Sequence, residues 1–86
     1  MRASTTTVAE PELGGTIVSN RIRQLRFENG EMTQQELGKR IGVTRQTVNA
    51  IELGNYSPSL EAAFRMAEVF GVPLEQVFQY KPMDPA

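Results

Sequence analysis

The sequence predicts an all-α domain of five short helices, and three observations support this fold class. Apolar residues recur at intervals of three and four along most of the chain, which is the spacing of amphipathic helices. Helix-start residues such as Ser and Thr precede the periodic segments, and glycines follow them. The 86 residues allow one domain with a modest core, so we expect no separate sensor or catalytic domain.

The amino-acid composition excludes several classes of function. The chain contains no cysteine and no histidine. Thiol nucleophiles, disulfides and the usual zinc and imidazole sites are therefore not available to it. We expect neither an enzyme nor a bound metal or other cofactor. No apolar run is long enough for a signal peptide or a membrane span, so we expect a cytoplasmic protein.

The N-terminal segment leads into the first helix. Residues 1–15 are rich in Thr, Ala, Pro, Glu and Gly without hydrophobic periodicity, which predicts a disordered arm. Residues 16–18 are all β-branched and would form an edge strand if another segment pairs with them. Ser19 or Asn20 then caps the first helix, whose inward residues include Ile22, and a glycine at position 30 ends it.

The second helix has the clearest start signal of the chain. Thr33 is followed three residues later by Glu36, the pattern of a capping box in which two backbone amides are satisfied reciprocally. The helix runs to about Ile41. Leu37 and Ile41 are four residues apart and face inward, and Gly42 ends the helix.

The third helix begins after a joint of only three residues. Thr44 caps it, and it runs from residue 45 to about 53. So short a joint favours a steep crossing of the two helices, as in a helix-turn-helix, over antiparallel packing. Gly38 fits this geometry, because crossing helices need a small residue where their backbones approach. The predicted helix-turn-helix therefore spans residues 33 to about 53.

The fourth helix is predicted to be the most buried. It begins after Ser59 and ends at Gly71. Its polar residues Glu61, Arg65 and Glu68 form one narrow stripe at helical spacing, and its other residues are apolar. We therefore expect burial on most sides, partly by a second subunit.

A short fifth helix completes the predicted fold. It covers residues 74–78, with Pro73 where a first helical residue would lie. Residues 79–82 are extended and could pair with residues 16–18 in a small two-stranded β element. The predicted organisation is an arm (1–15), one domain (16–82) and a flexible tail (83–86).

The distribution of charge is more informative than its total. A net charge of −1 argues against a protein that coats nucleic acid regardless of sequence, since such binding depends on neutralising phosphates. Between residues 19 and 53, however, six basic residues outnumber four acidic ones. One face of the domain can therefore be basic on an acidic protein.

The outward face of the third helix carries side chains suited to reading DNA. With Val48 and Ile51 buried, the side chains of Arg45, Gln46 and Asn49 remain outside. Arg can donate two hydrogen bonds to guanine, and Gln or Asn can pair with adenine. Taken alone, these residues could equally be a solvated face. Their position on the second of two tightly linked helices favours contact with bases in the major groove.

Neutral hydroxyl, amide and phenol groups nearby would contact phosphates, which fix the register of a protein on DNA. Packing within the loop is the alternative for Tyr56. The predicted base contacts are Thr44, Arg45, Gln46 and Asn49. The predicted phosphate contacts are Thr33, Gln34, Thr47, Asn55, Tyr56 and Ser57.

Residues 33–52, TQQELGKRIGVTRQTVNAIE, resemble the helix-turn-helix of the Xre family, which includes the lambdoid phage repressors and Cro. The resemblance covers about residues 19–80. The chain is most similar to the short cytolysin-repressor type, through RQT at 45–47, NYSPSL at 55–60 and PLEQVFQY at 73–80. The resemblance implies a lambda-repressor-like domain of five helices, a symmetric dimer and a small β element after the last helix.

The same resemblance assigns roles to individual residues. It implies that Gln34, Thr44, Arg45, Gln46 and Asn49 contact DNA. It also implies that Arg26 and Glu52 form a partly buried ion pair tying the first helix to the third, and breaking one side of such a pair costs roughly 3–5 kcal/mol. The arm of fifteen residues departs from the short relatives.

We therefore expect a sequence-specific regulator of transcription. One unit reads only a few base pairs, so specificity needs a homodimer facing an inverted repeat of double-stranded DNA, with recognition helices about 34 Å apart. Binding across a promoter would exclude polymerase, which favours a repressor. The predicted dimer interface comprises Ile17, Val18, Leu74, Val77, Phe78 and Tyr80.

One alternative keeps the fold and changes the partner. The chain would then be an antitoxin or partner-binding module, whose apolar surface, including Phe64 and Val69, covers another protein.

Overall fold

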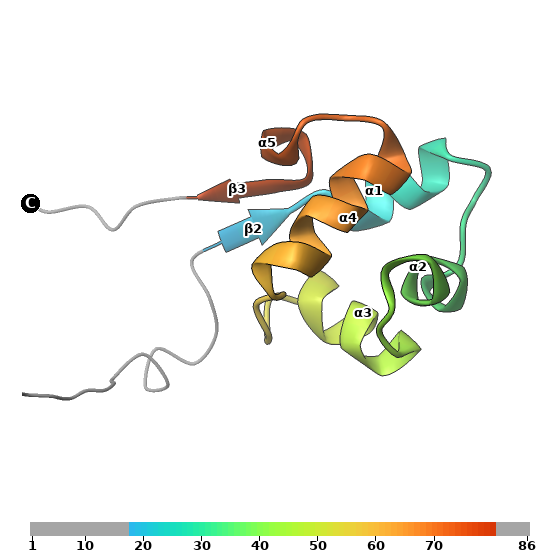
Figure 1. Cartoon of the computed structure of the whole chain (residues 1–86), viewed down its shortest axis with the longest axis horizontal. Helices are drawn as coiled ribbons and strands as arrows, with labels where there is room; N and C mark the ends of the chain where they lie inside the picture. The colour runs from blue at the N-terminus through green and yellow to red at the C-terminus, as the bar shows by residue number, and fades with distance from the viewer. Residues whose placement is uncertain (1–17, 81–86) are drawn as a thin grey trace, which may run out of the picture.

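Residues 18–80 are described by the computed structural model, and they form five helices and one pair of strands (Figure 1). The helices are α1 (Ile22–Glu28), α2 (Gln34–Ile41), α3 (Arg45–Glu52), α4 (Leu60–Phe70) and α5 (Leu74–Val77), and the strands are β2 (Val18–Asn20) and β3 (Phe78–Tyr80). The predicted fold class is confirmed. No helix within residues 18–80 is long and apolar enough to cross a membrane. The predicted arm and tail lie outside the described residues.

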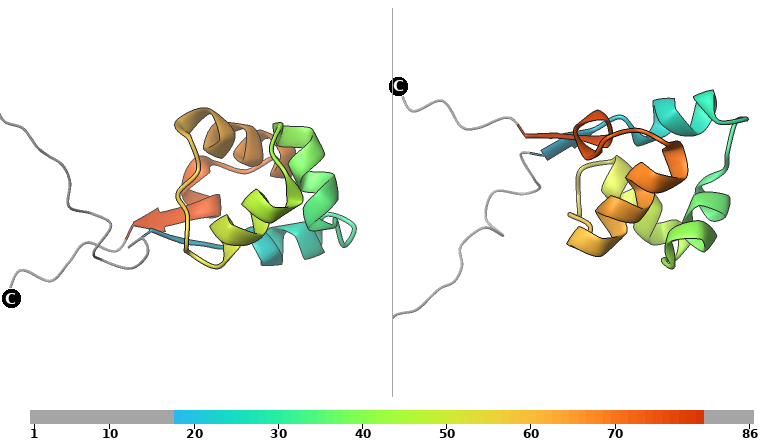
Figure 2. Two further views of the ribbon diagram at one scale, coloured as in Figure 1. Left: turned by 90° about the horizontal axis from the view of Figure 1, so that it is seen from below. Right: turned by 45° about the horizontal axis from the view of Figure 1, so that its top comes forward.

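Apolar side chains from all five helices meet in one core. The helix α2 packs against α3 and α4, and α5 packs against α4. Figure 2 shows α2 and α3 adjoining each other, with the strands at the end of the domain away from α2. Each fully buried aliphatic side chain contributes about 1.5–3 kcal/mol relative to exposure. The largest fully buried side chains are Ile22, Leu37, Ile41, Val48, Met66 and Val77.

Three helices begin at the hydroxyl residues that the sequence predicted. Thr33 Oγ1 accepts a hydrogen bond from the Glu36 backbone N–H at 3.0 Å, and Glu36 Oε1 accepts one from the Thr33 N–H at 3.4 Å, which completes the capping box. Thr44 and Ser59 likewise accept bonds from the third backbone N–H of α3 and α4. Such caps typically stabilise a helix by about 1 kcal/mol, so the starts of α2, α3 and α4 are fixed locally.

The joint between α2 and α3 folds back onto α2. A Cβ atom added at Gly38 would lie 2.7 Å from the carbonyl oxygen of Val43 and 3.3 Å from the carbonyl carbon of Thr44. Gly42 ends α2 with a φ of +82°, in the left-handed region that favours glycine. The close approach at Gly38 is therefore to the turn before α3, and it sets the angle at which α3 leaves.

The two strands join the beginning and the end of the described chain. They are antiparallel, with Val18 opposite Tyr80, Ser19 opposite Gln79 and Asn20 opposite Phe78. The sequence predicted the pairing but placed it at 16–18 and 79–82, and residues 16, 17, 81 and 82 lie outside the described residues.

The fifth helix is shorter than predicted. It ends at Val77, and Phe78 has the extended angles φ −126° and ψ 138° because it pairs with Asn20. Pro73 is the N-cap, with ψ 156°, and does not take the first helical position. Its carbonyl oxygen accepts a hydrogen bond from the Gln76 N–H at 2.9 Å.

The start of α1 also differs from the prediction. Arg21 occupies the N-cap position and makes no capping bond through its side chain. Asn20, one residue earlier, accepts a hydrogen bond from the Ile22 N–H through Oδ1 at 3.1 Å. The predicted residue therefore supports the helix start from the end of β2.

Candidate nucleic-acid interface

The outward face of α3 is built as the sequence predicted. Val48 and Ile51 are buried in the core, and Arg45, Gln46 and Asn49 are exposed. Within residues 18–80, the side chains of Arg45 and Gln46 have no hydrogen-bond or ion-pair partner. Their donor groups are therefore free to bind a ligand outside the domain.

A mostly buried ion pair lies behind this face. Arg26 Nε donates to Glu52 Oε2 at 2.6 Å and Arg26 Nη2 donates to Glu52 Oε1 at 3.2 Å. The two side chains are 13% and 9% exposed. Arg26 Nη1 also donates to the Met32 carbonyl oxygen at 2.7 Å. Because paired hydrogen bonds of this kind are strong and directional, they hold α1, the segment before α2, and α3 in one arrangement.

Gln34 connects the ion pair to the outward face. Its Nε2 donates to Glu52 Oε1 at 3.2 Å and to Asn49 Oδ1 at 3.0 Å. An amide nitrogen has two hydrogens, and both are used here. The side chain of Gln34 therefore has no donor left for the predicted phosphate contact. The remaining donors at this position are the backbone N–H groups of Gln34 and Gln35, which the first turn of an α-helix leaves without an internal acceptor.

The threonine hydroxyls differ in what they leave free. The Thr44 hydroxyl accepts from the Thr47 N–H at 3.1 Å and donates to Thr47 Oγ1 at 3.0 Å. Its only hydrogen is therefore used, and its methyl group is the part that can contact a ligand. The hydroxyl hydrogens of Thr33 and Thr47 are not donated to any group within residues 18–80.

The loop between α3 and α4 extends the same surface. The Asn55 N–H donates to the Ala50 carbonyl oxygen at 2.9 Å, which fastens the loop to the end of α3. Asn55, Tyr56 and Ser57 are exposed. Tyr56 keeps 55% of its surface exposed, although it also lines a small cleft against the strands. In the described chain, the side chains of these three residues have no hydrogen-bond partner.

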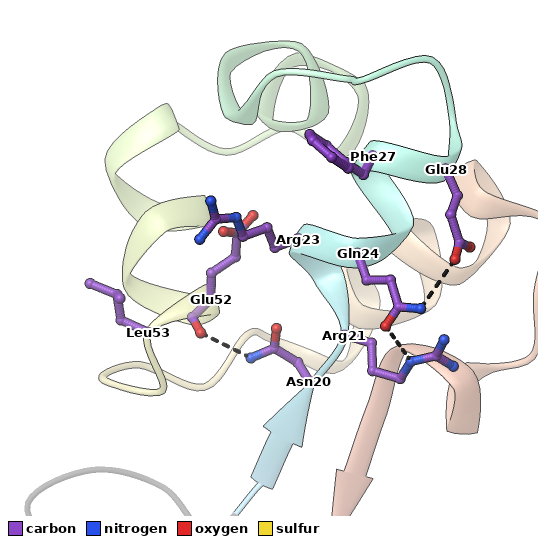
Figure 3. Close-up of a pocket in the computed structure, with 8 residues that line it drawn as sticks. All are labelled: Asn20, Arg21, Arg23, Gln24, Phe27, Glu28, Glu52 and Leu53. Carbon is purple, nitrogen blue, oxygen red and sulfur yellow. Dashed lines mark hydrogen bonds between the residues drawn. The ribbon is translucent and has the colours of Figure 1, made fainter.

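A groove on the other side of Glu52 was not anticipated from the sequence. It lies between α1 and the end of α3, and Figure 3 shows Arg23 extending across it from α1. Phe27 and Leu53 flank it and are 68% and 65% exposed. Periodicity could not reveal this groove, because it depends on how α1 crosses the end of α3.

A second surface lies at the strands. Val18, Leu74, Phe78 and Tyr80 line an apolar groove together with Leu60 and Ala63 of α4. Leu60 and Tyr80 are 70% and 65% exposed. Val77, predicted as an interface residue, has no exposed surface and belongs to the core, so it cannot touch a partner. Ile17 lies outside the described residues.

Comparison with known proteins identifies the family. The helix-turn-helix family HTH_3 matches residues 22–77. An uncharacterized HTH-type transcriptional regulator of Methanocaldococcus jannaschii is 52% identical over 50 residues, which are 58% of this chain and 76% of the relative. An uncharacterized HTH-type transcriptional regulator of Bacillus subtilis is 44% identical over 61 residues, which are 71% of this chain and 91% of the relative.

A phage protein is also similar. The transcriptional repressor of the cryptic phage CTXphi in Vibrio cholerae is 39% identical over 59 residues, which are 69% of this chain and 52% of the relative. The matched region contains α1 to α5 and thus the whole arrangement of α2, turn and α3. The chain therefore belongs to the helix-turn-helix family HTH_3, the Xre type of DNA-binding transcriptional regulators.

Proposed function

We propose that this chain is a transcriptional repressor that binds an inverted-repeat operator as a homodimer, with α3 in the major groove of each half-site. The observation that carries the proposal is the exposed face of α3, where Arg45 and Gln46 have no partner within residues 18–80. Side chains of these types recognise base edges, and helices in this position of a helix-turn-helix enter the major groove. The similarity to a phage repressor supports repression.

The base contacts follow from the groups that remain free. Arg45 and Gln46 would each donate to base edges, and Asn49 would join them one turn later on α3. Thr44 would contribute its methyl group, which suits the methyl group of thymine, since its hydroxyl is already used.

The phosphate contacts would come from both ends of the helix-turn-helix. At the start of α2, the hydroxyl hydrogen of Thr33 and the first-turn backbone N–H groups would donate to a phosphate, for which a helix start is a common site. At the other end, donors would come from the Thr47 hydroxyl and from the loop residues Asn55, Tyr56 and Ser57. They would bind phosphates of the same DNA strand or of the complementary DNA strand.

The dimer would form through the apolar groove at the strands. Its exposed apolar residues, Leu60 and Tyr80 among them, are unusual on a monomer of this size and would be covered by a second copy. A twofold axis at this surface would present two copies of α3 to half-sites about 10 base pairs apart.

Fluorescence anisotropy tests whether the chain recognises a DNA sequence through α3. Wild-type protein, Arg45→Ala and Arg40→Ala are titrated against DNA from the chain's own promoter region and against a scrambled duplex in moderate salt. We expect tight binding to the promoter DNA alone and a loss of at least roughly tenfold in Arg45→Ala. Arg40→Ala is the matched control, because it also removes one exposed arginine but lies on α2.

Two results would contradict the proposal. Equal and weak binding to both duplexes would show that the chain does not recognise a DNA sequence. It would favour binding to a protein partner, as expected of an antitoxin. Equal losses in Arg45→Ala and Arg40→Ala would show that arginine at position 45 contributes only charge.

A further inference from the structure

We propose that Gln34 and Glu52 hold the side-chain amide of Asn49 in one orientation, so that Asn49 presents N–H donors to DNA and selects guanine at its position. The inference rests on the proposed function and names a determinant of its specificity. Gln34 and Glu52 are positioning residues in this scheme, since they act on DNA through Asn49.

The orientation begins at Glu52. Its carboxylate accepts two hydrogen bonds from Arg26 and lies almost entirely out of solvent. A carboxylate can only accept hydrogen bonds. The atom of Gln34 that lies 3.2 Å from Glu52 Oε1 must therefore be the amide nitrogen, and this fixes which way the Gln34 amide faces.

The second hydrogen of the same nitrogen fixes Asn49. Gln34 Nε2 also lies 3.0 Å from the Asn49 side chain, so the Asn49 atom facing it must be an acceptor, Oδ1. Asn49 Nδ2 then faces away from Gln34. Within the described part of the chain, its two hydrogens have no acceptor, and the residue is exposed. Arg26, Glu52, Gln34 and Asn49 thus form one chain of hydrogen bonds that ends in free donors at the surface.

A side-chain amide held in one orientation prefers different bases from an amide that is free to rotate. A free Asn pairs with adenine by accepting from N6 and donating to N7. Here Oδ1 is turned toward Gln34 and one of its two acceptor sites is taken, whereas Nδ2 faces away and offers two free donors. Guanine presents two acceptors in the major groove, N7 and O6, and adenine presents one acceptor and one donor. The held orientation therefore favours guanine.

The test starts from a duplex library with randomised positions, from which wild-type protein enriches its binding site. The position read by Asn49 is the one at which Asn49→Ala loses its base preference. At that position we expect wild type to bind guanine roughly tenfold more tightly than adenine, and to lose affinity when guanine is replaced by 7-deazaguanine.

Gln34→Ala and Gln34→Met remove the amide that holds Asn49, and the second keeps the length of the side chain. Both are expected to bring the preference for guanine over adenine to roughly threefold or less. Lys39→Ala is the control, because Lys39 is exposed on α2 and its side chain makes no hydrogen bond or ion pair within residues 18–80. It should keep the wild-type preference. The ratio of two affinities does not change when a variant merely lowers stability.

Three outcomes overturn the inference while leaving the proposed function intact: a preference for adenine at the Asn49 position, an unchanged preference in both Gln34 variants, or no effect of Asn49→Ala at any position. Failure of the library to yield any enriched sequence would instead reject the proposed function, and with it the inference.

Discussion

At the scale of single residues, Asn20 joins three elements through one side chain. Its Oδ1 accepts from the first backbone N–H of α1, and its Nδ2 donates to the carbonyl oxygens of Ile51 at 3.0 Å and Glu52 at 3.4 Å. The last carbonyl groups of a helix have no partner within the helix, and this contact adds to the bond that the Ile51 carbonyl oxygen accepts from the Gly54 N–H at 3.0 Å. The end of the proposed reading helix is thereby fastened to the strand β2.

Asn20→Asp is expected to lower the free energy of unfolding by about 1–3 kcal/mol. The aspartate keeps the acceptor for the Ile22 N–H but removes the donor and sets a carboxylate against two carbonyl oxygens. Urea unfolding followed by circular dichroism measures the change. Ser19→Ala is the control, because Ser19 is exposed and its bonds to Gln79 are long, at 3.4 and 3.5 Å. Similar losses in both variants would show that Asn20 does not hold α3.

Residue roles that depend on near neighbours could be predicted from the sequence. The capping hydroxyls of Thr33, Thr44 and Ser59 each bond a backbone group three residues away, so a local pattern was sufficient. The partners of Gln34 could not be predicted in this way. They lie 15 and 18 residues away and are reached only because α2 crosses α3 at one particular angle.

At the scale of elements, the turn between α2 and α3 decides how α3 is held against α2. It passes so close to α2 that the carbonyl oxygen of Val43 would lie 2.7 Å from a Cβ at position 38. The Gly42 N–H and Val43 N–H both donate to the Gly38 carbonyl oxygen, at 2.8 and 2.9 Å. These bonds hold the turn against α2, and its geometry requires glycine at position 38.

Gly38→Ala should destabilise the domain by about 1–3 kcal/mol, because the methyl group meets backbone atoms that cannot move aside. At an ordinary helix position the same substitution would stabilise by roughly 1 kcal/mol, so the sign of the effect is diagnostic. Thermal unfolding checks it. Gln35→Ala, on the exposed side of the same helix, should leave the melting temperature nearly unchanged. A gain in stability for Gly38→Ala would mean that the turn relaxes away from α2.

Element boundaries near the C-terminal side were harder to predict. Residues 74–78 carry one continuous helical pattern, and Phe78 follows Val77 with no local stop signal. The helix ends there because Phe78 pairs with Asn20, which lies at the opposite end of the described chain. Tertiary pairing overrode local propensity.

At the scale of the whole molecule, two of the exposed surfaces of the domain differ clearly in character. One is the polar face of α3, and the other is the apolar groove lined by Val18, Leu60, Leu74 and Tyr80. Hydrophobic periodicity predicts which residues are shielded from solvent. It cannot tell whether they lie in the core of one subunit or in its interface with another. Val77 shows this, since it matched the pattern of its half-buried neighbours Leu74 and Phe78 and lies wholly within the core.

The proposed dimer can be tested with one matched pair of variants. Leu60 and Leu53 are exposed to 70% and 65%, but only Leu60 lines the apolar groove. Sedimentation equilibrium should show a dimer for wild type and Leu53→Glu, and a monomer for Leu60→Glu, because a charge would be buried at the contact. The melting temperature of wild type should rise with concentration. A dimer that survives Leu60→Glu would place the interface elsewhere.

The pairing of β2 with β3 also determines when the fold can be completed during synthesis. Ser19 and Gln79 face each other across the sheet although they are 60 positions apart. Helices form from local contacts within about a microsecond, whereas a strand that pairs across so long a loop must wait for the whole segment between. On the ribosome, the residues of α2 and α3 are added before Phe78 and Tyr80. Helices of eight residues are marginal on their own and the core draws on all five helices, so the fold is completed late. Subunits that meet through the groove can assemble only after residue 80 has been added and β3 has formed.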